Sequence, residues 1–109
     1  MKYLAAFLLC FSVLIAHANV DSCVVHVENA FTPSGDNDDE GWEVYSNCVP
    51  ESYHVRVFNR WGEQVWESKD IHEIWIGKGM TTDVYVWSME VKFADEETRK
   101  LKGHVSLIR

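Results

Sequence analysis

Apolar and polar residues alternate along several short stretches of the chain. In residues 53–58 a tyrosine and two valines alternate with a histidine, an arginine and a phenylalanine, and residues 22–28 alternate in a similar way. A period of two residues is typical of a β-strand with one buried face. The same reasoning predicts further strands over residues 42–45, 64–67, 83–93 and 101–108.

Two neighbouring stretches need a separate interpretation. Residues 83–93 are apolar on both sides of the predicted strand, because Val84 and Val86 alternate with Tyr85 and Trp87, so we expect this strand to be buried on both faces. Residues 94–100, ADEETRK, could form one helical turn, but their position between two strands favours a charged hairpin loop. Six or seven short strands separated by turns predict an all-β sandwich of about seven strands.

The stretch FNRWG, residues 58–62, falls between two of the predicted strands. Asn59 at the first position and Gly62 at the last suit a type I turn followed by a left-handed residue. The backbone does not explain Arg60 and Trp61 at the two central positions. Either the Trp61 ring folds back over the sheet edge, with Arg60 stacked on an aromatic ring, or both side chains are exposed for recognition.

The first residues of the chain have the pattern of a cleavable signal peptide. Lys2 precedes an apolar run over residues 3–16, and residues 16–18 are the small-x-small sequence Ala-His-Ala. Such a run is short for a membrane span and is typical of export. We expect residues 1–18 to be removed, with cleavage before Asn19.

The exported part is acidic. Residues 19–109 keep nine of the ten basic residues, because Lys2 is lost, and all 17 acidic ones, so the formal charge changes from −7 to −8. A charge of this sign argues against nucleic acid as a partner and against binding to an anionic lipid surface. We expect one domain that does not span a membrane once the signal peptide is gone.

Two cysteines remain in the exported part, Cys23 and Cys48. In an oxidising compartment a small domain commonly gains stability from a disulfide. A bond between them would close a loop of about 25 residues and stabilise the domain by roughly 3 kcal/mol. The alternative is a pair of free thiols.

Several stretches of the chain also resemble one protein family in the same order along the sequence. Residues 29–36 (NAFTPSGD) resemble an opening NAFTPNGD, residues 58–62 match a central FNRWG, and the last residues (KGHVSLIR) resemble a closing KGxVxLIR. Residues 75–77 are WIG where WDG is usual. These features resemble the gliding-motility-associated C-terminal domain of Bacteroidetes-type bacteria, the type B sorting domain of type IX secretion.

The resemblance implies an immunoglobulin-like β-sandwich that acts as an address for secretion and is linked to gliding motility. A signal peptide would carry the chain into the periplasm, and outer-membrane secretion and attachment machinery would then move it to the cell surface or the medium. We expect a stand-alone copy, since no passenger separates the leader from the domain. The residues expected to be recognised are Phe31, Thr32, Pro33, Gly35, Asn59, Arg60, Trp61, Gly62, Lys102, Gly103 and Arg109. For Lys102 and Arg109 the alternative is solubility and protection of the sheet edge.

The acidic stretch TPSGDNDDEG, residues 32–41, permits a calcium hypothesis. Asp36, Asp38 and Glu40 occupy alternate positions before Gly41, as in the first half of a calcium-binding loop. The twelfth position is Asn47 and not the bidentate glutamate that completes such a loop. The alternative is a solvated turn in which the carboxylates bind no ion. No other cofactor is expected.

The sequence does not predict an enzyme. The histidines of the exported part lack the spacing of a zinc pair, and no serine lies within a nucleophile elbow. The histidines are His26, His54, His72 and His104.

A carbohydrate- or protein-binding module is the second hypothesis, because exposed tryptophan rings stack well on sugars. We expect about three of the five tryptophans to be buried in the core. A row of exposed rings on one sheet face would favour carbohydrate, and one isolated ring at a tip would favour a protein partner. The five are Trp42, Trp61, Trp66, Trp75 and Trp87.

Overall fold

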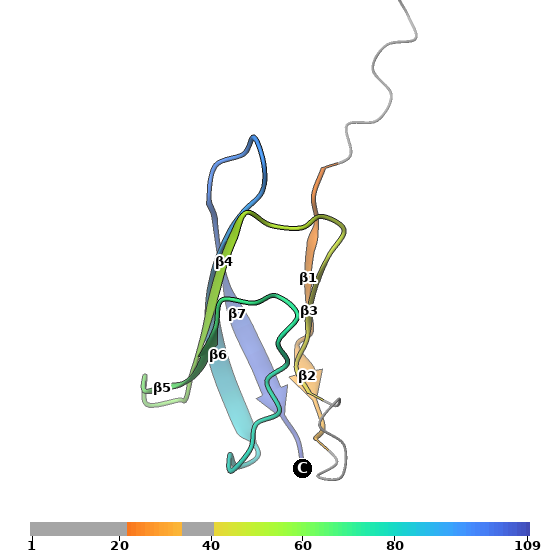
Figure 1. Cartoon of the computed structure of the whole chain (residues 1–109). Coiled ribbons are helices and arrows are strands. Elements are labelled where there is room, and N and C mark those ends of the chain that lie inside the picture. Colours follow the sequence, from red (N-terminus) through yellow and green to blue (C-terminus); the bar gives the residue numbers. More distant parts are fainter. Residues whose placement is uncertain (1–21, 34–40) are drawn as a thin grey trace, which may run out of the picture.

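Seven strands form two sheets that face each other in the computed structural model, which describes residues 22–33 and 41–109 (Figure 1). No helix occurs within these residues, so the prediction of an all-β sandwich is confirmed. The alternation of apolar and polar residues gives each strand one face to bury, and the two layers bury those faces against each other. The strands are β1 (Val25–Val27), β2 (Ala30–Phe31), β3 (Val44–Ser46), β4 (Ser52–Phe58), β5 (Gln64–Ser68), β6 (Asp83–Lys92) and β7 (Arg99–Leu107).

The larger sheet has the strand order β2-β7-β6-β4-β5, and the smaller sheet pairs β1 with β3. β1 is antiparallel to β3, whereas β2, only two residues further along the chain, is parallel to β7. The first segment of the domain therefore passes from one sheet to the other. The antiparallel neighbours β4, β6 and β7, with β5 outside β4, form the central sheet of an immunoglobulin-like sandwich.

The hydrophobic pattern predicts six of these strands, and the exception is β2. Two residues are too few to show a period, and β2 exists because Asn29 and Phe31 accept hydrogen bonds from the backbone N–H groups of Ser106 and Ile108. These long-range bonds cannot be inferred from local sequence.

The expectation that residues 83–93 are buried on both faces is wrong. The side chains of Tyr85, Trp87 and Met89 are at most 7% exposed, whereas Val84 and Val86 are 47% and 38% exposed. Within the described residues the two-stranded sheet covers only one side of the five-stranded sheet (Figure 1). The side turned away from β1 and β3 is called the outer face below.

Tryptophans form the centre of the core. Trp42, Trp75 and Trp87 are 1%, 3% and 7% exposed. Trp42 and Trp75 exchange backbone hydrogen bonds of 2.8 and 3.2 Å, and the Trp42 indole donates to the Glu28 carbonyl at 2.6 Å. The connection between β5 and β6, which carries Trp75, is thereby fastened to the segment that leads into β3. It closes one side of the sandwich (Figure 1).

Cys23 and Cys48 form the predicted disulfide, with 5.5 Å between their Cα atoms. The register of β1 on β3 pairs Val25 with Ser46, and continuing that register by two residues places the cysteines opposite each other. The bond therefore joins the two strands of the smaller sheet at one end. It does not link the two layers of the sandwich.

Candidate recognition site

The turn between β4 and β5 is built around Asn59. The Gly62 N–H donates to the Asn59 carbonyl at 3.0 Å, and the Asn59 N–H donates to the Glu63 carbonyl at 2.9 Å. The Asn59 side-chain oxygen also accepts hydrogen bonds from the N–H groups of Trp61 and Glu63, both at 2.9 Å. Gly62 has φ of 83°, the left-handed conformation expected for the last residue of this turn. Four hydrogen bonds therefore hold a short tip in one shape.

The two central residues of this tip are exposed. Trp61 is 76% exposed, which makes it the most exposed aromatic residue among those described. The Arg60 guanidinium lies 5.9 Å from the centre of the Trp61 ring, and its Nε is 3.2 Å from an Asp83 carboxylate oxygen. Of the two alternatives for Trp61, folded over the sheet or exposed, the structure therefore has the exposed one. Arg60 thus contacts both Asp83 and the Trp61 ring.

A groove of about 200 Å³ separates the tip from the connection that leads into β6. Trp61 and Val65 lie on the tip side, and Met80 and Thr81 on the other. Tyr85 also lines the groove, and its hydroxyl donates to the Thr81 carbonyl at 2.9 Å. This arrangement provides an exposed aromatic ring, a cation and an adjoining hollow in one place, the combination in which binding energy is commonly concentrated.

Arg109 holds the far wall of this groove. Its guanidinium donates to the carbonyl of Met80 at 2.9 Å and to that of Gly77 at 2.6 Å, and its backbone N–H donates to the Thr82 hydroxyl at 3.0 Å. The closing residues of the chain thus fasten residues 77–82 beside the tip. Arg109 has a structural task here, in addition to the recognition proposed from the sequence.

The other recognition candidates lie in different surroundings. Phe31 is buried in the core, with its ring centre 5.2 Å from that of Trp75. Gly103 lies against the Trp87 ring, and a Cβ at that position would come within 2.8 Å of it. Phe31 and Gly103 therefore serve packing. Thr32 and Lys102 are exposed, Pro33 is half-buried, and Gly35 lies outside the described residues.

The calcium hypothesis falls on Asp36, Asp38 and Glu40, which also lie outside the described residues. Within residues 22–33 and 41–109, histidine, cysteine, aspartate and glutamate side chains nowhere gather in threes that could hold a metal ion. His54 pairs with Glu67 at 2.7 Å, and this hydrogen bond is the main cause of the lowered pKa of the Glu67 carboxyl. Burial raises the pKa of the Tyr53 phenol, and the nearby carboxylates of Asp70 and Glu73 add to the effect.

The tryptophan count fits the expectation from the sequence. Three of the five rings are buried, Trp66 is half-buried, and Trp61 alone is exposed. The part of the chain that the structure describes thus has one isolated tryptophan ring at a tip and no row of exposed tryptophan rings on a sheet face. By the criterion stated above, this arrangement favours a protein partner over carbohydrate.

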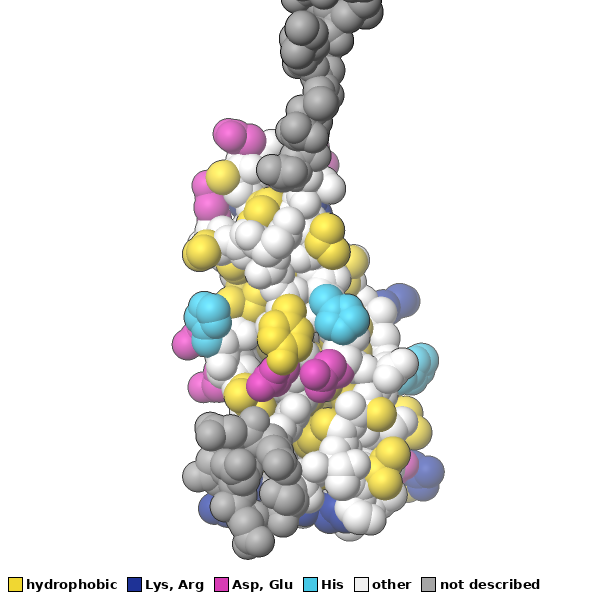
Figure 2. Space-filling view, turned by 90° about the vertical axis from the view of Figure 1, so that its right-hand side faces the viewer, with side chains coloured by type: hydrophobic (Ala, Val, Ile, Leu, Met, Phe, Trp, Pro, Cys, Tyr) yellow, Lys and Arg dark blue, Asp and Glu magenta, His cyan; other side chains and the backbone are white. Residues whose placement is uncertain are grey.

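The face formed by β1 and β3 is of a different kind. Figure 2 shows apolar, acidic and histidine side chains mixed on it, with lysine and arginine only near its margins. Tyr45 is 51% exposed there, and its hydroxyl donates to the Glu43 carboxylate. A hollow of about 160 Å³ beside Tyr45 is lined in part by Ile71 and His72. We assign no function to this face.

The sequence did not predict which residues form the far wall of the groove beside the tip. Met80 and Thr81 belong to no motif and show no period, and the bonds from Arg109 that position them span about thirty residues. The sequence gives one indication that Asp83 could contribute to the site, because a carboxylate at the start of a predicted strand can pair with an arginine at a tip. Its pairing with Arg60 depends on how β4 and β6 align.

The described residues contain no helix with the length and apolar character that crossing a bilayer requires. No curated protein and no solved structure gives a significant match to this chain. One family model does match, over residues 25–107, and its description is the CHU_C type IX secretion signal domain. The match begins at β1, includes the tip and ends with the last residue of β7. The chain therefore belongs to the type IX secretion signal domain family.

Proposed function

We propose that the outer-membrane translocon of type IX secretion recognises this domain through the tip Asn59–Gly62 and the adjoining groove. Family membership gives the domain a sorting role, with export across the outer membrane to the cell surface or the medium. Passage through the periplasm, after removal of residues 1–18, is part of the proposal. A single observation carries the choice of surface: an exposed Trp61 at a rigid tip.

The geometry supports recognition through this tip for an energetic reason. A tryptophan that is 76% exposed gains little from folding but can bury most of its ring against a partner. The turn is already held by hydrogen bonds from Asn59, so binding would cost little ordering of the backbone. Arg60 adds an exposed charge that pairs with Asp83 at the edge of the groove. Tryptophan and arginine are the side chains that most often dominate binding at protein interfaces.

A sorting signal needs a shape and no chemistry. The family is a sorting signal and not a catalytic family. The isolated pair of His54 and Glu67 lies on β4 and β5, away from the tip turn and outside the groove beside it. We therefore assign the domain a binding role.

A reporter experiment tests the sorting role. Residues 19–109 are fused to the C-terminus of an exported reporter in a host that has type IX secretion, and the reporter is measured in the periplasm, on the surface and in the medium. We expect the fused reporter to leave the periplasm, as it does with an established sorting domain. A reporter that stays in the periplasm while the established domain moves it outward would contradict the proposal.

A link to gliding motility is the second part of the proposal, and it rests on the family resemblance alone. Deletion of the coding sequence in a gliding host should reduce the spreading of colonies on agar. Restoring the wild-type gene should recover spreading. Unchanged spreading of the deletion strain would remove gliding from the proposal and leave sorting intact.

A further inference from the structure

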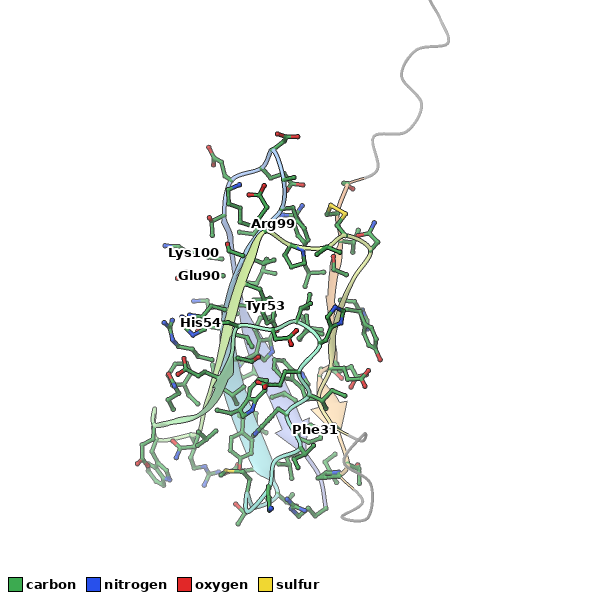
Figure 3. All side chains as sticks on the ribbon, in the orientation of Figure 1. Phe31, Tyr53, His54, Glu90, Arg99 and Lys100 are labelled. Carbon is green, nitrogen blue, oxygen red and sulfur yellow. A yellow bond between two sulfur atoms is a disulfide. The ribbon has the colours of Figure 1, made fainter. Side chains whose placement is uncertain are left out.

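The outer face of the five-stranded sheet carries a concentration of positive charge on an acidic domain. Four of the ten basic residues of the chain lie on this face, because they alternate with buried positions of β4 and β6 and with half-buried positions of β7. Figure 3 shows His54, Glu90 and Lys100 on the side of the sheet away from β1 and β3. The four basic residues are Arg56, Lys92, Lys100 and Lys102.

Three of these cations surround a hollow of about 310 Å³. The lining, called the cationic hollow below, contains Arg56, Lys100 and Lys102, one carboxylate from Glu90, and parts of His54 and Ser88. The strand register explains why they meet: Arg56 is opposite Ser88, Ser88 is opposite Lys102, and Glu90 is opposite Lys100.

The cations of the hollow have no ion-pair partner among the described residues. Lys92, at the end of the face, pairs with Glu51 at 2.7 Å. His54 pairs with the Glu67 carboxylate, also at 2.7 Å. Among residues 22–33 and 41–109, no carboxylate oxygen lies within 4 Å of the charged nitrogens of the other three. Arg56 is opposite Glu67 in the register, and its charge acts on that carboxyl. The positive charge available to an external anion is therefore mainly that of Lys100 and Lys102.

An apolar strip lies beside the cationic hollow on the same face. It consists of Phe58, Val84 and Val86, of which Phe58 and Val86 are opposite each other in the register. The two valines are 47% and 38% exposed and Phe58 is half-buried. A ligand that covers the whole face therefore has to be anionic at one end and apolar at the other.

We propose that the outer face is a second docking surface, separate from the tip, that binds an acidic segment of a partner protein. Carboxylates of the segment enter the cationic hollow, and an adjacent apolar side chain covers the apolar strip. Glu90 disfavours a dense polyanion such as a sulfated polysaccharide, because its carboxylate would face several negative groups at once. A polypeptide can place single carboxylates beside the cations and leave Glu90 facing an amide N–H group.

The test uses the full chain, expressed with its own leader and purified in the form that the host exports. The probe is a short blocked peptide of glutamate and leucine, and binding is followed by NMR and by calorimetry at low and high salt. We expect saturable binding that weakens with salt, with shifts at backbone signals of β4, β6 and β7. The same peptide with glutamine for glutamate should not bind.

Two charge-reversal variants locate the site. Lys100→Glu with Lys102→Glu should weaken binding of the peptide by about tenfold or more. Lys69→Glu with Lys78→Glu changes the net charge equally, at exposed positions outside the hollow, and should weaken it less than about threefold.

Three results would overturn the proposal. They are equal losses in the two variants, absence of saturable binding at millimolar peptide, and binding of dextran sulfate or inorganic phosphate at the hollow with the peptide inactive. All variants must retain the wild-type thermal transition. Lys100 lies outside the tip groove and is not among the residues expected to be recognised. Sorting of the reporter should therefore survive Lys100→Glu alone, so the two proposals fail separately.

Discussion

Two tryptophans of this domain have opposite surroundings. Trp42 is 1% exposed, and its indole donates to the Glu28 carbonyl, whereas Trp61 is 76% exposed at the end of a turn. The first contributes its apolar area to folding, and the second keeps that area available for a partner. The difference teaches that a family signature such as FNRWG can combine residues that the fold needs, here Asn59 and Gly62, with residues that it does not.

The largest expected effect is the difference in the free energy of unfolding between variants of the two tryptophans. Trp42→Ala should lower the free energy of unfolding by about 3–5 kcal/mol, because it removes a fully buried ring and leaves the Glu28 carbonyl without its donor. Trp61→Ala should change it by less than about 0.5 kcal/mol. Denaturant unfolding followed by circular dichroism measures both. Similar losses in the two variants would show that the Trp61 ring packs on the domain.

The disulfide gives the next largest effect, and it concerns only the smaller sheet. Replacing Cys23 and Cys48 by alanine should cost about 3 kcal/mol, since the bond closes a loop with a sequence separation of 25. Trp61 lies in the turn between two strands of the other sheet, so its accessibility to acrylamide quenching should stay unchanged in the folded variant. A change in quenching of Trp61, isolated by comparison with Trp61→Phe, would show that the tip depends on the smaller sheet.

Two glycines repeat the contrast between core and tip at a smaller scale. A Cβ at Gly103 would come within 2.8 Å of the Trp87 ring, so Gly103→Ala should cost roughly 1–3 kcal/mol by overpacking. Gly62 has open space around it, and Gly62→Ala should cost about 1 kcal/mol through its positive φ alone. A crystal structure of each variant checks the cause: a displaced Trp87 for Gly103→Ala and an altered turn for Gly62→Ala.

The smallest expected effect is the pH response of the His54–Glu67 pair on the outer face. The hydrogen bond from His54 lowers the pKa of the Glu67 carboxyl in the folded state. Its contribution to stability is therefore complete above the glutamate pKa of the unfolded chain, roughly 4.3, and is lost as the pH falls through the lower folded value. Carboxyl NMR titration should show the pKa of Glu67 rising in His54→Ala. An unchanged Glu67 pKa in that variant would contradict this cause.

The features of this domain that the sequence predicts correctly depend on residues that lie close together along the chain. The alternation in residues 53–58 and the Asn59 and Gly62 pair predict a strand and a turn, because both features depend on residues a few positions apart. β2 escaped prediction because its hydrogen bonds reach β7. The prediction that β6 is buried on both faces was wrong, because hydrophobicity does not reveal whether a second layer covers a strand.

The same division applies to the candidate sites. The place of Trp61 in the turn made it a recognition candidate, a role that stays a prediction, and the sequence left its exposure open as one of two alternatives. The groove wall at Met80 and the cationic hollow were missed, because they depend on Arg109 and on the register of β4, β6 and β7. Phe31 and Gly103, chosen from family motifs, lie where they serve packing.

The central claim is that the exposed tip, and not the stability of the fold, carries recognition by the secretion machinery. The most direct test places Trp61→Ala in the reporter fusion, beside Val49→Ala, which truncates an 87% exposed side chain in the β3–β4 connection, at the opposite end of the sandwich from the tip. We predict that Trp61→Ala leaves the reporter in the periplasm, although the domain unfolds at the wild-type temperature, and that Val49→Ala is sorted normally. Normal surface delivery of the Trp61→Ala fusion would contradict the claim.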